Sequence, residues 1–476
     1  MAVSVATSAG GEMTISDEVL EAFRRQVRGL VLTPTDPGYD GVRPTSNAMY
    51  EGRAALAVRC SGTADVAAAV NFARDNGLLL AVRGGGHSIA GLSAGDGAML
   101  IDLSLMDGVQ VDPERRLARV QGGARWGDVD RETQLFGLAT PGGVNSDTGV
   151  AGLTLGGGYG WIRRKHGLAC DNLVEAQVVG ADGEVRTASA DSHPDLYWAL
   201  RGGGGNFGVV TSFTFKLHPV GPTVAFVGTV YPIEEMARVV RGWRSYLAGA
   251  PDEVTSVLVA FTFPAAPDLP PPVHNRACAV VGGVYVGDVD EGMAVMQPLR
   301  ELAEPVVDLT HPAPYTFVQS AFDALLARHT LRSYWKSQYL PDLSDDVIDA
   351  LAALALDRPA PLVLLNLWPM GGAVNRVDPE ATAFAERSAP YMVSIDGNWD
   401  DPGRDDEIIG WVRSAWSRIG EFGTGGVYLN FTGLAGEATN ASVDSALGRN
   451  LQRLASVKST YDPGNLFRLN NNIAPA

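Results

Sequence analysis

Three clusters of glycine and one histidine are the residues with the clearest chemical potential in this chain. The glycines gather at 84–86, 156–160 and 202–208. Gly-rich turns let backbone N–H groups face phosphates and let the backbone approach a ligand closely. The first cluster is followed at once by His87, whose imidazole is a competent nucleophile near neutral pH. One such cluster is more often a tight turn, so only the combination points to a cofactor site.

The residues around these clusters are predicted to form short helices and strands. An apolar strand over 78–82 runs directly into the first cluster, and an alternating strand over 209–217 follows the third. The third cluster therefore follows a helix and precedes a strand. In a nicotinamide-binding Rossmann fold the glycines lie in the reverse order, after a strand and before a helix. A Rossmann fold is therefore not expected here. The other elements predicted for this half are helices from Asp17 (capped by Ser16), from Thr63 and over 194–200, strands over 99–103 and on both sides of Asp112-Pro113, and a hairpin over 176–188.

The composition narrows the class of protein. The chain has 476 residues, is 46% hydrophobic and 19% charged, and is typical of a soluble globular enzyme of two or three domains. A formal net charge of −17 argues against a nucleic-acid partner. No apolar stretch is long enough to span a membrane and the N-terminus lacks the pattern of a signal peptide, so we expect a cytoplasmic protein. No metal site is expected, because neither the histidines nor the three distant cysteines (Cys60, Cys170 and Cys278) show ligand spacing.

Motifs in a fixed order along nearly the whole chain resemble one enzyme family. They are similar to the berberine-bridge-enzyme-like branch of the vanillyl-alcohol-oxidase superfamily, most closely to its bacterial members from secondary metabolism. The motifs are Arg83-Gly84-Gly85-Gly86-His87-Ser88, Ile101-Asp102-Leu103-Ser104, Gly156-Gly157-Gly158-Tyr159-Gly160, Asp171-Asn172-Leu173, Trp198-Ala199-Leu200-Arg201 through Val209-Val210-Thr211, and Tyr461-Asp462-Pro463-Gly464-Asn465-Leu466-Phe467.

The resemblance implies an α+β fold with a two-part FAD-binding domain and a separate substrate domain. Residues 1–220 would form the FAD-binding domain, of the PCMH type from about residue 50 onward. Residues 221–430 would form an α+β substrate domain of antiparallel sheet covered by helices, with the boundary at a change of composition near 219–222. Residues 431–476 would return to the FAD-binding domain.

The resemblance also implies FAD held by a single covalent 8α-histidyl bond through His87. Many relatives add a second bond from a cysteine, but alignment places Asn145 or its neighbours there, none of them a cysteine. Cys170 is expected to be a small buried residue. The other residues expected to bind FAD are Arg83, Gly84, Gly85, Gly86, Ser88, Gly122, Thr148, Gly149, Gly152, Gly157, Gly158, Gly208, Val209, Val210, Asn470 and Asn472.

Thr148 falls where the family holds the small residue that gates oxygen, which favours an oxidase. Many relatives carry a tyrosine base in a Tyr-x-Asn-Tyr strand, whereas here Phe431 occupies the position of the second tyrosine and has no base to offer. Asn366 and Trp368 share one face of a strand predicted over 362–370 that should cross the substrate side. Tyr159 and Trp161 are further candidates to line the site, Tyr334, Tyr339 and Tyr428 are weaker ones, and the catalytic base stays open.

The expected reaction is oxidation of an alcohol, phenol or similar group of a small, hydrophobic metabolite, with hydride transfer to flavin N5 and reoxidation by O2 to give H2O2. Three alternatives stay open at this point: a carbohydrate oxidase, an oxygenase that inserts oxygen, and a flavoprotein that binds a metabolite in a resistance role. The oligomeric state is not indicated by the sequence.

Overall fold

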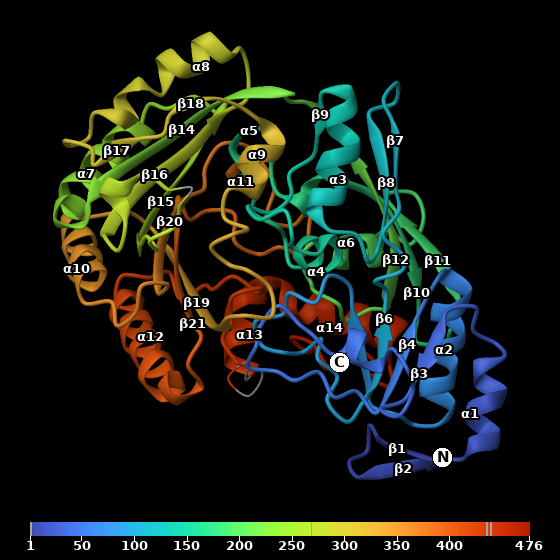
Figure 1. Ribbon diagram of the computed structural model, residues 1–476. Helices are drawn as coiled ribbons and strands as arrows, with labels where there is room; N and C mark the ends of the chain where they lie inside the picture. The colour runs from blue at the N-terminus through green and yellow to red at the C-terminus, as the bar shows by residue number, and fades with distance from the viewer. Residues whose placement is uncertain (1, 268, 435–436, 438–439) are drawn as a thin grey trace.

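Two parts pack against each other in the protein, each built around its own β-sheet structure (Figure 1). The computed structural model describes residues 2–267, 269–434, 437 and 440–476. Helices and open sheets are mixed in both parts, as the predicted α+β class requires. Within the described ranges, no helix is long and apolar enough to cross a bilayer.

The first part carries all three glycine clusters and holds two larger sheets, besides the two-stranded sheets formed by β1 (Val3–Ala6) with β2 (Glu12–Ile15) and by β9 (Leu138–Ala139) with β13 (His218–Pro219). A four-stranded sheet has the order β3–β4–β6–β5, in which β4, β6 and β5 run parallel. A five-stranded antiparallel sheet has the order β11–β10–β12–β8–β7. The strands are β3 (Leu30–Leu32), β4 (Leu56–Arg59), β5 (Leu80–Arg83), β6 (Met99–Asp102), β7 (Val109–Asp112), β8 (Leu117–Gln121), β10 (Leu173–Val179), β11 (Val185–Ser189) and β12 (Val209–Lys216).

Several helices and a hairpin predicted from local sequence patterns are present in the structure. Helix α1 (Asp17–Arg24) begins where Ser16 Oγ accepts the N–H of Val19 at 3.3 Å. Helices α2 (Thr63–Asp75) and α6 (Pro194–Ala199) also form where predicted. The predicted hairpin forms in register, with Ala176 opposite Ala188. Short-range pattern and turn chemistry were sufficient to predict these elements.

The second part is one large antiparallel sheet whose strands all lie between residues 223 and 399. Its order is β17–β14–β16–β15–β20–β21–β19, with β18 beside β14. The proposed domain boundary near residue 221 falls between β13 (His218–Pro219) and this sheet. The strands are β14 (Thr223–Pro232), β15 (Val254–Thr262), β16 (Ala277–Tyr285), β17 (Val307–Asp308), β18 (His311–Pro314), β19 (Arg332–Leu340), β20 (Leu364–Pro369) and β21 (Tyr391–Trp399).

Helices cover the outer face of this sheet, and its inner face is turned toward the first part (Figure 1). The helices are α7 (Met236–Leu247), α8 (Val289–Val295), α10 (Asp345–Leu356) and α12 (Asp405–Gly420). Leu365 and Leu367 of β20 pack into the core beneath these helices, whereas Leu364 and Trp368 belong to a different apolar cluster on the inner face. The alternation of side chains along each strand thus separates a structural face from a face available for function.

The C-terminal segment returns to the first part. Helices α13 (Asn440–Leu447) and α14 (Leu451–Tyr461) follow the large sheet, and Leu454 and Val457 share the core that contains α6 and the five-stranded sheet. The buried ammonium of Lys458 secures the chain beyond α14, because it donates to Asp462 Oδ2 at 2.7 Å and to the carbonyl of Phe467 at 3.0 Å. The last residues are thereby held against the glycine clusters.

Candidate active site

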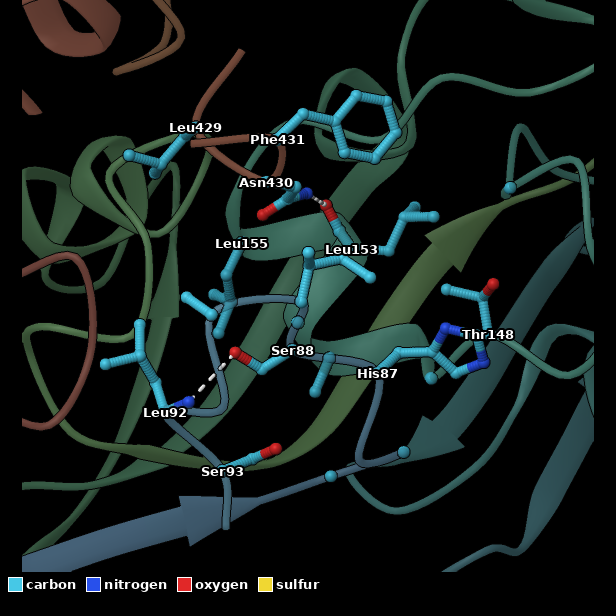
Figure 2. A pocket seen from close by; sticks show the side chains of 18 of the residues that line it. His87, Ser88, Leu92, Ser93, Thr148, Leu153, Leu155, Leu429, Asn430 and Phe431 are labelled. Carbon is cyan, nitrogen blue, oxygen red and sulfur yellow. Dashed lines mark hydrogen bonds between the residues drawn. The ribbon is translucent and has the colours of Figure 1, made fainter. Parts of the chain in front are cut away.

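A cavity of about 330 Å³ lies between the two parts, within the size range typical of small-molecule and cofactor sites. The first part contributes the loop after β5, helix α4 (Val150–Leu155) and the glycines at 204, 205 and 208. The second part contributes the inner face of its sheet. Figure 2 shows Leu153 and Leu155 of α4 together with His87 and Ser88 of the loop and Asn430 and Phe431 of the late turn.

The loop after β5 can enter the cavity because two glycines meet there without side chains. A Cβ atom added to Gly85 would lie 2.3 Å from the Cα of Gly149, and one added to Gly149 would lie 2.5 Å from the Cα of Gly85. Such distances exclude any side chain at either position without movement of the backbone. The loop is also fixed by its own hydrogen bond from the Leu92 N–H to Ser88 Oγ at 3.1 Å (Figure 2).

His87 lines the cavity next to Thr148 (Figure 2) and is paired with a carboxylate. Its Nε2 lies 3.0 Å from Oδ2 of Asp147. Burial by itself would raise the pKa of Asp147, but the contacts with His87 and Arg328 outweigh it and hold the pKa below its usual range. Asp147 is therefore an anion at neutral pH and accepts a hydrogen bond from His87.

Arg328 ties this carboxylate to the glycine loop. Its Nη1 donates to Asp147 Oδ1 at 2.9 Å, and its Nη2 donates to the carbonyl of Gly85 at 2.6 Å. The guanidinium comes from the segment before β19, in the second part of the molecule. Arg328, a side chain of the second part, thus fixes both Asp147, the partner of His87, and the backbone at Gly85.

The inner face of the sheet forms an apolar wall with few polar groups. Leu364, Asn366 and Trp368 alternate along β20 and all three line the cavity, as predicted for Asn366 and Trp368. The remaining large side chains of this wall are apolar or aromatic. They are Val257, Val259, Phe322, Leu326, Trp335 and Met392.

Asp396 is the exception in this wall. It lies on β21, is only 7% exposed, and lines the cavity. Burial raises its pKa to about 7, although hydrogen bonds with Ser394 and Asn366 act in the opposite direction. Its Oδ2 accepts from Asn366 Nδ2 at 2.7 Å, whereas its buried Oδ1 has no partner among the described residues. A carboxylate with one free oxygen in an apolar pocket is a candidate general base.

The aromatic candidates divide between the cavity and the core behind it. Tyr159 lines the cavity, but its hydroxyl is hydrogen-bonded to that of Tyr339, and burial raises the pKa of both phenols well above their usual value. Trp161 lies outside the cavity walls and stacks on Phe322, with the centroids of the two rings 6.1 Å apart. Tyr334 and Tyr339 are buried away from the cavity walls.

The segment that corresponds to the Tyr-x-Asn-Tyr strand of relatives is a turn in this protein. Residues 428–431 form no strand, and the N–H of Phe431 donates to the carbonyl of Tyr428 at 2.9 Å. Phe431 lines the cavity, as expected, and presents a hydrocarbon ring there (Figure 2). The Tyr428 hydroxyl accepts from the Gly158 N–H and from Asn430, and burial raises its pKa, so it is poorly suited to act as a base.

Most residues predicted to bind the cofactor line the cavity, and a few support it from behind. Arg83 is buried and donates to the carbonyls of Ser93 and Ala94, which shapes the loop rather than the cavity wall. Those in the wall are Gly84, Gly85, Gly86, His87, Ser88, Thr148, Gly149, Gly152, Gly208, Val209, Val210 and Asn470. Those outside it are Arg83, Gly122, Gly157, Gly158 and Asn472.

The structure separates the two residues that were considered for a second flavin bond. Asn145, expected at the position of that bond, lines the cavity. Cys170 is fully buried outside the cavity walls, with its Sγ 3.7 Å from Asp171 Oδ1, which agrees with the small buried residue expected. Cys60 and Cys278 are also free and buried.

Three charged residues of the site were missed by the sequence reasoning: Asp147, Arg328 and Asp396. Asp147 directly precedes Thr148, and Asp396 interrupts the buried strand β21, where an acidic residue is unusual enough to attract attention. Arg328 has no local signal, because its role arises only when the two parts of the chain come together.

Comparisons with known proteins agree along the whole chain. A family model described as an FAD binding domain matches residues 54–189, and one described as berberine and berberine-like matches residues 427–474. An FAD-linked oxidoreductase of Bacillus subtilis strain 168 is 30% identical over 460 residues, which cover 95% of this chain and 98% of the relative. The (R)-6-hydroxynicotine oxidase of Paenarthrobacter nicotinovorans is 30% identical over 470 residues, 94% of this chain and 97% of that enzyme.

A solved structure shows the same architecture. The crystal structure of 6-hydroxy-D-nicotine oxidase from Arthrobacter nicotinovorans superposes with a TM-score of 0.82 at 30% identity, and the match covers 94% of this chain and 98% of the other. The likeness therefore includes both parts of the molecule and the C-terminal return.

Proposed function

Because the chain belongs to the berberine-bridge-enzyme-like family of FAD-linked oxidoreductases, we propose that it oxidises a hydroxyl-bearing, largely apolar small molecule and passes the electrons to O2, with release of H2O2. The observation that carries this proposal is Asp396, a buried carboxylate with one free oxygen in an apolar wall. FAD, when bound, supplies the hydride acceptor at N5 and the position from which O2 takes up two electrons.

The residues of the first part fit this cofactor. The glycines of two clusters leave room for a ligand to approach the backbone, and His87 stands in the wall as a nucleophile. Two buried oxygens in the wall, Asn470 Oδ1 and Ser93 Oγ, have no partner among the described residues, so a bound ligand could satisfy them. We propose that His87 carries FAD through a single covalent bond, because Asn145 replaces the cysteine that would give the second.

With an alcohol as substrate, Asp396 would accept the hydroxyl proton while the carbon that bears the hydroxyl gives up its hydride. With a phenol, whose hydroxyl carbon has no hydrogen, the hydride would come from a C–H bond of a ring substituent. The product is then a carbonyl compound, and the proton and hydride leave with O2 as H2O2. Asn366 holds Oδ2 of the carboxylate, which leaves Oδ1 directed to a substrate. Asn366 and Trp368 both contact Ser394 Oγ, at 3.0 and 3.2 Å, so they would orient the base and line the pocket.

The apolar wall favours a hydrophobic alcohol or phenol over a sugar. A carbohydrate needs several hydrogen-bond partners, whereas Val257, Val259, Leu364 and Met392 offer none. We expect aromatic alcohols to bleach the visible flavin absorption of the holoenzyme under anaerobic conditions, and sugars of similar size to leave it unchanged. Bleaching by sugars alone would favour a carbohydrate oxidase.

Readmission of air would then distinguish the remaining alternatives. One H2O2 per product supports an oxidase, whereas ¹⁸O from labelled O2 in the product would show an oxygenase. Tight binding of a metabolite without bleaching would support the resistance role.

Covalent attachment is tested by acid precipitation. Wild-type protein, washed after precipitation, should give a yellow pellet, and His87→Ala should give a colourless pellet with any flavin in the supernatant. His311→Ala is the matched control, because His311 is exposed on β18 and its imidazole, among the described residues, hydrogen-bonds to the carbonyl of Leu309 and packs against Phe226 and Phe317. A colourless wild-type pellet would contradict attachment but not the binding of FAD.

A further inference from the structure

The hydroxyl of Ser394 contacts three residues of the apolar wall from behind. Ser394 lies on β21, is fully buried and does not itself line the cavity. Its Oγ accepts from the Nδ2 of Asn366, the residue directly opposite on β20, at 3.0 Å, and from Trp368 Nε1 at 3.2 Å. It also bonds to Asp396, which lies two residues further along β21 on the same face of the sheet.

The capacity of a hydroxyl for hydrogen bonds determines the direction of these contacts. A serine hydroxyl has one hydrogen to donate and two lone pairs that accept. The N–H groups of Asn366 and Trp368 occupy both lone pairs, so the hydrogen of Ser394 is left for the carboxylate of Asp396. Asn366 Nδ2 also donates to Asp396 Oδ2 at 2.7 Å. The side chains of Ser394, Asn366 and Asp396 therefore form a closed ring of hydrogen bonds.

We infer that Ser394 is a positioning residue for the general base, because its single hydroxyl joins Trp368 and Asn366 of the substrate wall to the carboxylate of Asp396. The inference rests on the proposed function, in which Asp396 takes up the substrate proton. It adds the residue that keeps this carboxylate charged and in place. With Oδ2 held inside the ring, Oδ1 has no partner among the described residues and stays available to a substrate.

The surroundings of Asp396 give these neutral hydrogen bonds their weight. Burial raises the pKa of Asp396 to about 7, and the bonds from Ser394 and Asn366 act in the opposite direction. Among the described residues, no charged group shifts this pKa. The neighbours of Asp396 across the sheet are Leu364 of β20 and Trp335 of β19, and neither ionises. The other ionisable side chains that line the cavity are His87, Tyr159 and Tyr428.

The first test needs no substrate. Infrared difference spectra of the holoenzyme, recorded across a pH titration, follow the C=O stretch of protonated carboxyl groups, and the signal that is absent in Asp396→Asn belongs to Asp396. We expect Ser394→Ala to move the midpoint of this signal upward by about one pH unit, since a hydrogen bond to a charged group is lost. An unchanged midpoint in Ser394→Ala would overturn the inference.

The second test measures flavin reduction by stopped flow, with a benzylic alcohol as the probe. Ser394→Ala should slow reduction about 10-fold at pH 6 and hardly at all at pH 9, because the carboxylate is regained once the pH exceeds the raised pKa. Ser394→Thr, which keeps the hydroxyl, should restore most of the rate at pH 6. A variant that is slowed equally at every pH would show a merely structural role and would contradict the inference.

Ser256→Ala is the matched control for both tests. Ser256 is also a fully buried serine of the large sheet, and its Oγ also accepts an indole N–H, from Trp243 at 2.9 Å. Trp243, however, belongs to the core beneath the helices, on the other face of the sheet. This variant should therefore keep the wild-type midpoint and the wild-type rates.

The outcomes separate the inference from the proposed function. If Asp396→Asn keeps the wild-type rate and pH profile, Asp396 is not the base, and the role of Ser394 fails with it. If Asp396→Asn loses the rise with pH while Ser394→Ala keeps the wild-type midpoint, the base stands and the role of Ser394 alone is overturned. If benzylic alcohols do not reduce the flavin, the substrate class fails, and the infrared titration still decides the role of Ser394.

A second variant covers the case in which Ser394→Ala does not fold. Ser394→Cys is close in size, and its thiol is only a weak donor. Its infrared midpoint should also lie above that of the wild type. A midpoint equal to that of the wild type would overturn the inference.

Discussion

In the proposed reaction one carboxyl group, that of Asp396, accepts the proton of the substrate. We expect Asp396→Asn to lower kcat by about 10²- to 10⁴-fold, the usual contribution of a general base, with little change in bound flavin. Asp400→Asn, an exposed residue just beyond β21, is the matched control and should keep wild-type turnover. Stopped-flow reduction of the flavin by an aromatic alcohol measures both. Equal reduction rates in the two variants would remove Asp396 from the mechanism.

The same residue predicts the pH dependence. Burial raises the pKa of Asp396 to about 7, and only the deprotonated carboxylate can accept a proton. The rate constant for flavin reduction should therefore rise with pH and level off above about 7. In Asp396→Asn the remaining slow reaction should lose this rise. A wild-type profile that is flat between pH 5 and 9 would contradict the assignment.

The single-residue roles differ in how far the sequence could reveal them. His87 stands in a motif that is dense in glycine, so its surroundings in the sequence already indicate a ligand. Asp396 and Asp147 act through partners that are distant in sequence, such as Asn366 and Arg328. A local pattern contains no information on which distant side chain will lie 3 Å away. These two carboxylates therefore required the folded structure.

At the scale of elements, periodicity predicted the strands well, whereas resemblance to relatives was wrong about the late turn. The strand predicted over 362–370 is present as β20, because alternation of side chains follows directly from a sheet with two different faces. The Tyr-x-Asn-Tyr-like segment at 428–431 was expected on a strand from resemblance and is a turn. Thr432 forms only an isolated bridge to Lys336 of β19. The chain therefore approaches the sheet at this point without joining it.

Helix α14 offers a test of how the C-terminal segment is secured. Lys458 and Asp462 are both fully buried and lie 2.7 Å apart, and Lys458→Met would leave the aspartate without its charged partner. Removal of one member of a buried pair typically costs about 3–5 kcal/mol of the free energy of unfolding. Urea denaturation monitored by circular dichroism would measure this loss.

A surface pair of the same spacing is the control for that experiment. Arg186 and Asp182 also lie four residues apart, 2.5 Å from each other, but the aspartate is half exposed. Arg186→Met should cost less than about 1 kcal/mol. If Lys458→Met costs no more than Arg186→Met, the buried pair does not anchor the segment in the way that we describe.

At the scale of the whole molecule, the cavity belongs to both parts, so a ligand in it should stabilise both. We expect His87→Ala protein prepared without FAD to unfold at a lower temperature than the same protein with FAD. Stabilisation follows the ligand concentration, reaching about 2.7 kcal/mol at 100 times the Kd. Thermal unfolding across an FAD titration measures the effect.

The control ligand for the titration is riboflavin, which lacks the phosphates and the adenosine. Its stabilisation should be smaller than that of FAD at equal concentration, because the glycines at 204, 205 and 208 also line the cavity and would have no phosphate to meet. An FAD titration without any change in unfolding temperature would contradict the assignment of this cavity to the cofactor.

The two-part organisation was within reach of the sequence, whereas the contacts between the parts were not. The change of composition near 219–222 lies just before β14, where the large sheet begins. Arg328 and the Asp130–Gln319 hydrogen bond of 2.8 Å each join the two parts across more than 180 residues. Such contacts form only when the two folded parts pack against each other. The sequence pattern of one part does not show which residues of the other part it will contact.

The large sheet has a consequence for how this enzyme can change over generations. Val257, Leu364 and Met392 face the cavity, while their neighbours Leu258 and Leu365 face the helices. Heritable variation at the first set alters the shape offered to a substrate and leaves the packing under the helices untouched. New specificities can therefore accumulate on a scaffold that keeps folding, and a mutant library confined to cavity-facing positions should yield a high fraction of folded proteins.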